Sequence, residues 1–221
     1  MDMHWVWIAG LSFFATHVGV SSTGLRGMLL ARYGQQAYLG IYSVLAFATL
    51  VALVLTYNNT VHAPLLWPPL TLLPKLAMPL ALFLVVGGFT VPNPTNVGAE
   101  AKLAEEPRGM LRVTRHPVQW GLLLWSSSHL VANGDLASIA FFGSMGLVSA
   151  LGMLAMDRRK STLPAWPQFA ARTSLVPFVA IATGRNRLVP GELVLPLAIA
   201  APLTIAMWLL HPYLSGGIAI L

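Results

Sequence analysis

Long apolar segments, each close to the length of a membrane-crossing helix, dominate this sequence. They are separated by short connections that carry nearly all of the charge. A helix needs about 20 apolar residues to cross a hydrocarbon core about 30 Å thick. Six segments approach that length: residues 4–22, 37–57, 74–91, 118–133, 136–156 and 194–211. The sequence therefore predicts an all-α integral membrane protein, a bundle of about six transmembrane helices in one polytopic domain over residues 1–221.

The composition limits the chemistry that this chain can perform. Charged residues make up 9% of it, against about 25% in an ordinary soluble domain, and this supports the membrane prediction. The sequence has no cysteine, which excludes disulfides, thiolate catalysis, iron–sulfur clusters and covalent c-type haem attachment. Histidine is therefore the main candidate for binding a transition metal, beside nine methionines.

Basic residues are distributed very unevenly among the connections. Twelve of the thirteen lysines and arginines follow the first, third or fifth apolar segment, and Lys75 lies on the opposite side. Cytoplasmic connections of membrane proteins are enriched in Lys and Arg. We therefore expect a multi-pass protein of the bacterial inner membrane, with both termini on the outer, periplasmic side. The net charge of +6 then reflects topology, and no nucleic-acid partner is expected.

The carboxylates lie at the ends of the apolar segments or between them: Asp2, Glu100, Glu105, Glu106, Asp135, Asp157 and Glu192. Proton pumps and ion-coupled transporters usually place an ionisable acid within the membrane. The apolar segments contain no such acid, and the sequence has no internal repeat. Both observations argue against a transporter.

Two connections have a recognisable local pattern. Between the fourth and fifth segments, Gly134 suits a helix C-terminus and Asp135 suits the N-cap of the next helix, which predicts a tight helical hairpin. Segment 161–184 is apolar, but prolines interrupt it too often for a crossing helix. We expect a cytoplasmic interfacial segment, or a lid over a site that opens toward the cytosol. Its aromatic residues would then lie at the boundary between lipid and cytosol: Trp166, Phe169 and Phe178.

Two of the six histidines are expected deep in the membrane. His17 lies nine positions before Arg26, and His129 lies fourteen positions after Arg115, which is roughly 13 and 21 Å at ~1.5 Å per residue. Two imidazoles on separate helices could hold one metal from opposite sides, and a b-type haem needs little more than axial imidazoles and an apolar slot. The alternative is that each histidine bonds to serine or to a backbone carbonyl between packed helices. Three other histidines are expected near the outer face: His4, His62 and His211.

The Arg115-His116-Pro117 sequence is expected at the cytoplasmic interface. Proline suits the first position of a helix, where its missing N–H costs nothing. One interpretation is that His116 only takes part in the helix start and in contacts with lipid headgroups. The other is that the nearby arginines bind haem propionates, phospholipid headgroups or an anionic cofactor: Arg108, Arg112 and Arg115.

Several motifs occur in order along nearly the whole chain. They are HVGVSSTGLR at 17–26, RHP at 115–117, SHLVANGD at 128–135, DRR at 157–159, ARTSLVPF at 171–178 and HP at 211–212. Together they resemble the NnrU family, which includes the 15-cis-zeta-carotene isomerase of plants and cyanobacteria. The WPP at 67–69 and the PNPT at 92–95 resemble the bacterial branch of that family.

The resemblance implies a membrane haem b held by two histidines. One opens the first motif, and the other stands thirteen residues after the histidine of RHP. In this sequence they are His17 and His129, which would be both the metal ligands and the catalytic residues. Arg26, Arg115 and His116 complete the expected cofactor-binding set.

The implied activity is redox-gated cis–trans isomerisation of a lipophilic polyene such as 15-cis-zeta-carotene. Reduced haem would release one axial ligand and act as a Lewis acid on a cis double bond. The expected partners are membrane lipid, a lipophilic small-molecule substrate and an electron donor, and the pattern indicates no particular oligomeric state. The sequence departs from the isomerase by two extra positions between His17 and Arg26, and by Ala150 or a neighbour where the isomerase has a histidine pair. The alternative within the family is an NnrU-type haem or nitric-oxide-related protein of denitrification without isomerase activity.

A second resemblance leads to a different reaction. The RHPVQWG stretch, Asp157 and the FAARTSLVPF stretch are similar to the isoprenylcysteine and phospholipid methyltransferases of membranes, which bind S-adenosylmethionine near an RHPxYxG motif. Here Trp120 replaces the tyrosine of that motif. In such an enzyme Arg115 and His116 would face a cytosolic cofactor pocket, and His17 would have no special task.

Overall fold

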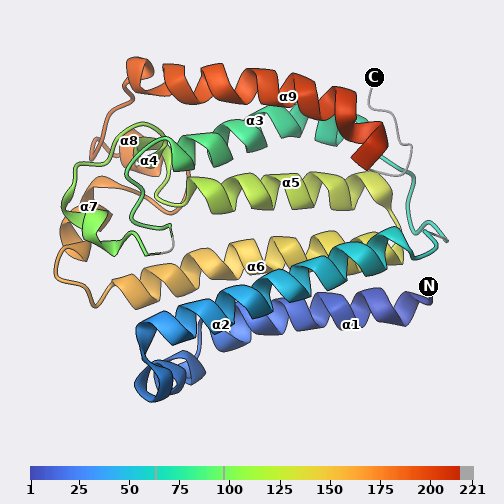
Figure 1. The fold of residues 1–221 in the computed structure, drawn as a ribbon. Helices are drawn as coiled ribbons and strands as arrows, with labels where there is room; N and C mark the ends of the chain where they lie inside the picture. The colour runs from blue at the N-terminus through green and yellow to red at the C-terminus, as the bar shows by residue number, and fades with distance from the viewer. Residues whose placement is uncertain (63, 97, 215–221) are drawn as a thin grey trace. The chain divides into compact units, whose positions relative to one another are not determined.

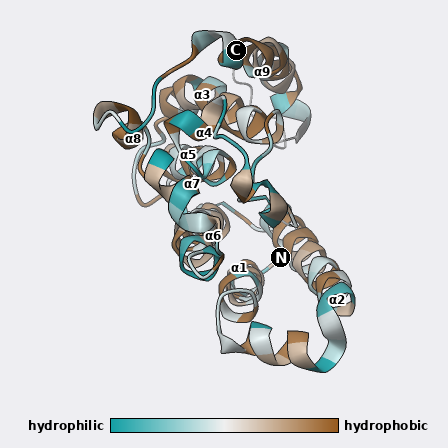
Figure 2. Cartoon of the chain, turned by 90° about the vertical axis from the view of Figure 1, so that its left-hand side faces the viewer, coloured by the Kyte–Doolittle hydropathy of each residue, from teal (hydrophilic) through white to brown (hydrophobic). Residues whose placement is uncertain are grey.

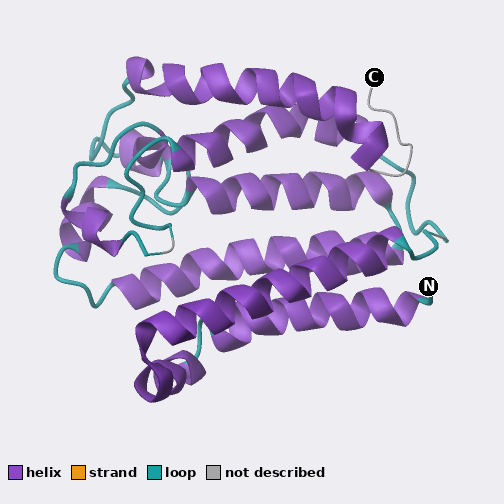
Figure 3. Ribbon diagram, in the orientation of Figure 1, coloured by secondary structure: helices purple, strands orange, loops and turns teal. Residues whose placement is uncertain are grey.

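The computed structural model describes residues 1–62, 64–96 and 98–214, and over these residues the chain consists of helices and connections (Figure 3). The long helices are α2 (Gly24–Asn58), α3 (Leu72–Phe89), α5 (Pro117–Asn133), α6 (Leu136–Lys160) and α9 (Val194–Leu214). The shorter ones are α1 (Met3–Phe14), α4 (Met110–Val113), α7 (Trp166–Arg172) and α8 (Val179–Ala182). α1 continues into a π-helical turn (Ala15–Val20), and 3-10 turns are formed by Glu100–Ala104 and Pro190–Leu193. The all-α fold class is thereby confirmed.

Four stretches in the described part of the chain are long and apolar enough to cross a membrane: Gly24–Asn58, Leu72–Phe89, Leu136–Lys160 and Pro190–Tyr213. The other two predicted spans are also helical but shorter. α5 has 17 residues, and α1 has 12 before its backbone changes to the wider π-helical turn. α2 exposes many large apolar side chains, such as Val44 at 70% and Phe47 at 67%. Exposed apolar surface on this scale is typical of a helix that faces lipid.

The beginning of α2 differs from the prediction, which placed a connection before residue 37. The helix starts at Gly24, where the side chain of Thr23 accepts a hydrogen bond from the backbone N–H of Leu25. It is kinked at Gly34, whose φ of 77° lies in the region that favours glycine. Arg26 therefore lies on a helix rather than in a loop.

The predicted hairpin between α5 and α6 is confirmed. Gly134 has a φ of 74°, and a Cβ atom there would lie 2.5 Å from the carbonyl oxygen of Trp67. Asp135 then caps α6, because its Oδ1 accepts a hydrogen bond of 2.9 Å from the backbone N–H of Ser138. The segment around Trp67 is attached to the same hairpin, since the indole Nε1 donates to the carbonyl oxygen of Val131 at 2.8 Å.

The chain divides into two compact units. The first comprises Met1–Pro74 and Ser126–Gly152, and the second comprises Lys75–Trp125 and the chain from Met153 onward. In the first unit α1 and α2 lie side by side (Figure 1). Gly10 allows α1 to approach α6, because a Cβ atom at Gly10 would lie 2.9 Å from the carbonyl oxygen of Ala140.

In the second unit α3 packs closely on α5. A Cβ atom at Gly121 would lie 2.6 Å from the carbonyl oxygen of Ala81, so only glycine permits this approach. α3 and α9 are predominantly hydrophobic along their length (Figure 2), and the short helices α4 and α7 each carry one arginine, Arg112 and Arg172, among mainly apolar residues.

A buried cluster corrects the prediction for the aromatic residues of segment 161–184. Trp166 and Phe169 are 7% and 2% exposed and pack against Leu103 and Leu111, so they belong to the core and not to the lipid boundary. Phe178 is 56% exposed. The segment forms two short helices rather than a crossing helix, as predicted.

Candidate functional site

His17 lies in the π-helical turn that extends α1. Its ring Nδ1 is 2.9 Å from the carbonyl oxygen of Phe13. Because a carbonyl oxygen only accepts, Nδ1 carries the proton and Nε2 carries the lone pair. Metal-binding histidines commonly have this tautomer, with the second nitrogen oriented by a carbonyl group. Single π-helical turns are also frequent at functional sites.

Aromatic rings connect His17 to a cationic residue. The ring of His17 is 4.1 Å from that of Phe13 and 6.2 Å from that of Tyr42. Tyr42 stacks on Tyr38 at 5.8 Å, and the guanidinium of Arg26 lies 5.6 Å from the centre of the Tyr38 ring. Arg26 and His17, both predicted cofactor contacts, are thus joined through two tyrosines.

His129 lies on the part of α5 that belongs to the same unit as His17. Its half-buried ring is 5.2 Å from that of Phe142. The neighbouring Ser126 and Ser128 are buried at 0% and 3% exposure. The expectation that His17 and His129 share one iron stays a prediction. The described His, Asp and Glu residues form no group of three or more that could hold a metal ion, but a pair of axial imidazoles is smaller than such a group.

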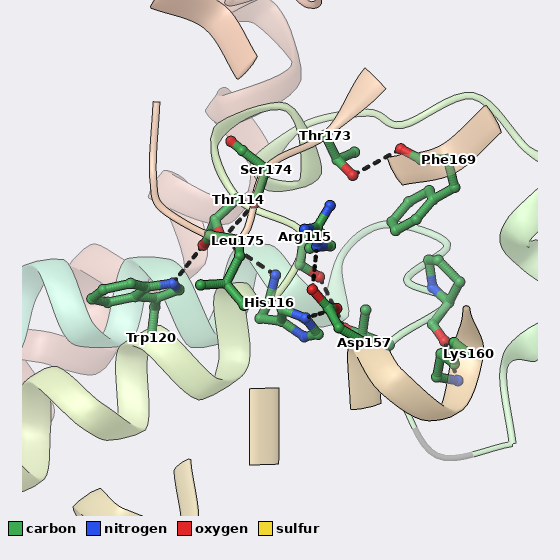
Figure 4. Close-up of polar contacts among 12 residues, drawn as sticks. Thr114, Arg115, His116, Trp120, Asp157, Lys160, Phe169, Thr173, Ser174 and Leu175 are labelled. Carbon is green, nitrogen blue, oxygen red and sulfur yellow. Dashed lines mark hydrogen bonds and ion pairs between the residues drawn. The ribbon is translucent and has the colours of Figure 1, made fainter. Parts of the chain in front are cut away.

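The second unit builds a different site around the Arg115-His116-Pro117 turn (Figure 4). Asp157, in the last turn of α6, accepts hydrogen bonds from the side chains of Arg115 and His116. His116 Nε2 is 2.6 Å from Oδ1 of Asp157, and Arg115 Nε donates to Oδ2 at 3.0 Å. The guanidinium of Arg115 also lies over the ring of Trp166, 5.6 Å from its centre. Pro117 is the first residue of α5, as predicted.

His116 is 1% exposed, which argues against the first interpretation, in which it contacts lipid headgroups. Burial lowers the pKa of His116 below its ordinary value, and the hydrogen bond to Asp157 opposes this shift without cancelling it. The imidazole is therefore neutral at pH 7, with the proton on Nε2 facing the carboxylate. Nδ1 is buried and has no hydrogen-bond partner in the described part of the chain.

The segment that precedes α8 is fixed against this turn. The backbone N–H of Arg115 donates to the carbonyl oxygen of Ser174 at 2.9 Å. The indole of Trp120 and the hydroxyl of Thr114 both donate to the carbonyl oxygen of Leu175, each at 2.8 Å (Figure 4). These bonds hold residues 174 and 175 rigidly beside Arg115.

Lys160 is a buried charge that sequence reasoning missed. It is 1% exposed, and its Nζ donates to the carbonyl oxygen of Pro94 at 2.8 Å and to Oε1 of Glu100 at 2.7 Å. Burial, the largest single influence, would raise the pKa of Glu100, but the hydrogen bond from Lys160, a backbone hydrogen bond and the charges of Lys160 and Arg159 together make the net shift downward. A lysine in a basic run predicts a solvated side chain, so only its partners across the fold could have shown this role.

These observations define a class of protein: an all-helical chain with several helices long and apolar enough to cross a membrane, a histidine in the tautomer of a metal ligand, and a carboxylate-bound Arg-His-Pro turn. The model of the NnrU protein family matches residues 6–218, and the chain belongs to that family.

Two curated proteins are similar to part of the chain. The chloroplastic 15-cis-zeta-carotene isomerase of Zea mays is 32% identical over 118 residues, which are 49% of this chain and 31% of that protein. The protein of the same name from Arabidopsis thaliana is 32% identical over 117 residues, again 49% and 31%. The chain thus spans about a third of the length of the relatives it matches. No solved structure matches it.

Proposed function

We propose that this protein is a membrane-embedded haem b protein that catalyses redox-gated cis–trans isomerisation of a lipophilic polyene such as 15-cis-zeta-carotene. The similarity to the plant isomerases supports the reaction. The single observation that carries the haem site is the Nδ1 bond of His17 to the Phe13 carbonyl, which directs the Nε2 lone pair away from its own helix backbone.

The residues around His17 fit a haem. Nε2 is the ligand atom, and the Phe13 carbonyl keeps it in the ligand tautomer. Phe13 and Tyr42 supply apolar ring surface beside it. Beyond Gly19 there is open space, because a Cβ atom there would meet nothing within 4 Å. Arg26, which follows on the next helix, is a suitable cation for a propionate.

When bound, the haem supplies an iron that acts as a Lewis acid in its reduced state. The chain's own residues perform the remaining tasks. His17 and His129 would hold the iron, and the carbonyl oxygen of Phe13 keeps the His17 ring in place. The apolar helices exclude water and admit a hydrophobic polyene from the bilayer. The proposal includes an external one-electron donor, which would supply the electron that reduces the haem.

We also propose that all six apolar segments cross the bacterial inner membrane, so that both termini face the periplasm. α1 with its π-helical turn and α5 would join the four longer helices as spans. Because the chain has no cysteine, single cysteines at Asp2 and Arg158, both exposed positions, can be labelled without background. Labelling of the first but not the second by an impermeant maleimide in spheroplasts supports this topology, and the reverse pattern overturns it.

The function is tested in two measurements. Absorption spectra of the detergent-purified protein, oxidised and dithionite-reduced, should show a b-type signal that fades in His17→Ala and in His129→Ala. Expression in a host that accumulates 15-cis-zeta-carotene should then convert it to the trans form. A haem signal without conversion of 15-cis-zeta-carotene would contradict the isomerase and favour a haem protein of denitrification without isomerase activity. Binding of S-adenosylmethionine without haem would favour the methyltransferase.

A further inference from the structure

A surface groove in the second unit consists of two adjoining hollows of opposite character. The first, of about 360 Å³, is lined mainly by charged side chains. The second, of about 330 Å³, is lined mainly by apolar atoms, including those of Leu175, Val176 and Val179. Arg185 lines both hollows. The groove thus changes from polar to apolar at one arginine.

The polar hollow has an excess of positive charge. Four arginines and one glutamate line it: Arg112, Arg172, Arg185, Arg187 and Glu106. Two of these arginines are already neutralised. Arg112 bonds to Glu192 through Nε and Nη2 at 2.8 and 3.0 Å, and Arg172 bonds to Glu106 at 2.9 Å.

The other two arginines keep their charge available. No carboxylate of the described residues forms an ion pair with Arg185 or Arg187. Arg185 donates from Nη1 to the carbonyl oxygen of Thr173 at 3.0 Å and from Nε to the hydroxyl of Thr183 at 3.0 Å. These bonds fix the guanidinium at the boundary of the two hollows and leave its Nη2 protons for another acceptor.

The turn that carries these arginines is rigid. Asn186 donates from Nδ2 to the carbonyl oxygen of Arg172, and its Oδ1 accepts from Arg112 Nη1 and from the backbone N–H of Arg187, all at 2.8 Å. A site whose residues are held before the ligand arrives loses less entropy on binding.

We infer that this groove binds an acidic glycerophospholipid of the bilayer, with its phosphate at Arg185 and Arg187 and an acyl chain along Leu175, Val176 and Val179. Guanidinium groups are suited to phosphate because their fork of N–H donors matches its oxygens. The apolar hollow offers a surface on which the acyl chain can pack. A bilayer source is favoured over a soluble phosphate because Val176 and Phe178 beside it are 51% and 56% exposed. This inference does not depend on haem or on polyene chemistry.

The test titrates the full-length protein in detergent with dioctanoyl phosphatidylglycerol, dioctanoyl phosphatidylcholine and inorganic phosphate, with bound adducts counted by native mass spectrometry. Phosphatidylglycerol should bind in preference to phosphatidylcholine. Arg187→Gln should weaken that binding about fivefold, because a basic side chain near an anionic lipid contributes about 1 kcal/mol. Arg187→Lys should retain most of it. The matched control is Arg158→Gln, which removes an exposed arginine outside the groove.

A second variant tests the contact with the acyl chain. The double substitution Val176→Ser and Val179→Ser should weaken the binding of dioctanoyl phosphatidylglycerol. It should leave unchanged the binding of glycerol phosphate, which has no acyl chain and is titrated in the same way. The inference is overturned if Arg187→Gln and Arg158→Gln weaken binding equally, or if phosphatidylcholine binds as well as phosphatidylglycerol. It is also overturned if inorganic phosphate competes at concentrations equal to those of the lipid, since the site would then take free phosphate.

Discussion

His17 donates its Nδ1 proton to the carbonyl oxygen of Phe13, 2.9 Å away in the preceding turn. This bond fixes both the tautomer and the plane of the ring, and it places the lone pair on Nε2. A histidine that serves only packing can form the same bond to a backbone carbonyl. The bond makes Nε2 available to a metal, and the haem spectra decide whether His17 binds one.

The first prediction is that His17 is replaceable by free imidazole. His17→Gly should lose the b-type reduced-minus-oxidised signal, and imidazole added to the buffer should restore it, because a detached ligand can occupy the space of the lost ring. Difference spectroscopy of the purified variant measures this. His4→Gly, at an exposed position of the same helix, should keep its signal throughout. An unchanged signal in His17→Gly would remove His17 from the ligand set.

The second prediction concerns Asp157, which receives both Arg115 and His116. Asp157→Ala would leave a guanidinium and a fully buried imidazole without their acceptor. Removing one member of a buried ion pair costs about 3 kcal/mol, so the melting temperature in detergent should fall by several degrees. Asp2→Ala is the matched control, because Asp2 is exposed and its side chain forms no capping bond. Equal melting temperatures for the two variants would contradict the structural role of Asp157.

Hydropathy predicted most of the helices because a run of apolar residues is a local property. The third segment, predicted at 74–91, is observed at Leu72–Phe89. The start of α2 was missed for the same reason. Arg26 and Arg32 lower the local hydropathy, yet the backbone continues to form helical hydrogen bonds through them up to the kink at Gly34.

The site was predictable only in part. The predicted depth of His17 in the membrane and the resemblance to the NnrU family both pointed to this residue. Its bond to Phe13 could not be predicted, because it depends on the π-helical turn. Asp157 and His116 are far apart in the sequence, and no spacing rule brings them together. Trp166 and Phe169 were predicted at the lipid boundary because aromatic residues are common there. The same side chains are equally suited to a protein core, and the fold buried them.

The third prediction is a loss of stability in mild acid. The pKa of His116 is lower in the folded protein than in the unfolded chain, chiefly because the ring is buried. Below about pH 6.5 the unfolded chain therefore binds a proton that the folded protein does not, and unfolding becomes easier as the pH falls toward the lowered pKa. The charged groups that face the ring do not reverse this: Arg115, Asp157 and Lys160.

Thermal melts of the wild type and of His116→Gln, from about pH 8 down to about pH 5, measure this effect. Gln does not titrate and can still donate to Asp157. Over this range the melting temperature of the wild type should fall further than that of the variant, and the difference should appear below about pH 6.5. Parallel curves would show that His116 carries the same charge in both states.

The fourth prediction separates backbone strain from crowding at two glycines. Gly134 and Gly184 have φ values of 74° and 71°, so alanine is strained at either position. At Gly184 a Cβ atom would meet nothing within 4 Å, whereas at Gly134 it would lie 2.5 Å from the carbonyl oxygen of Trp67. Gly184→Ala should therefore cost about 1–2 kcal/mol for the left-handed backbone alone. Gly134→Ala should cost roughly 1–3 kcal/mol more, since overpacking adds to the strain. Melting temperatures of the two variants in the same detergent measure the difference. Equal losses would mean that the Trp67 segment yields, despite the bond from its indole to the carbonyl oxygen of Val131.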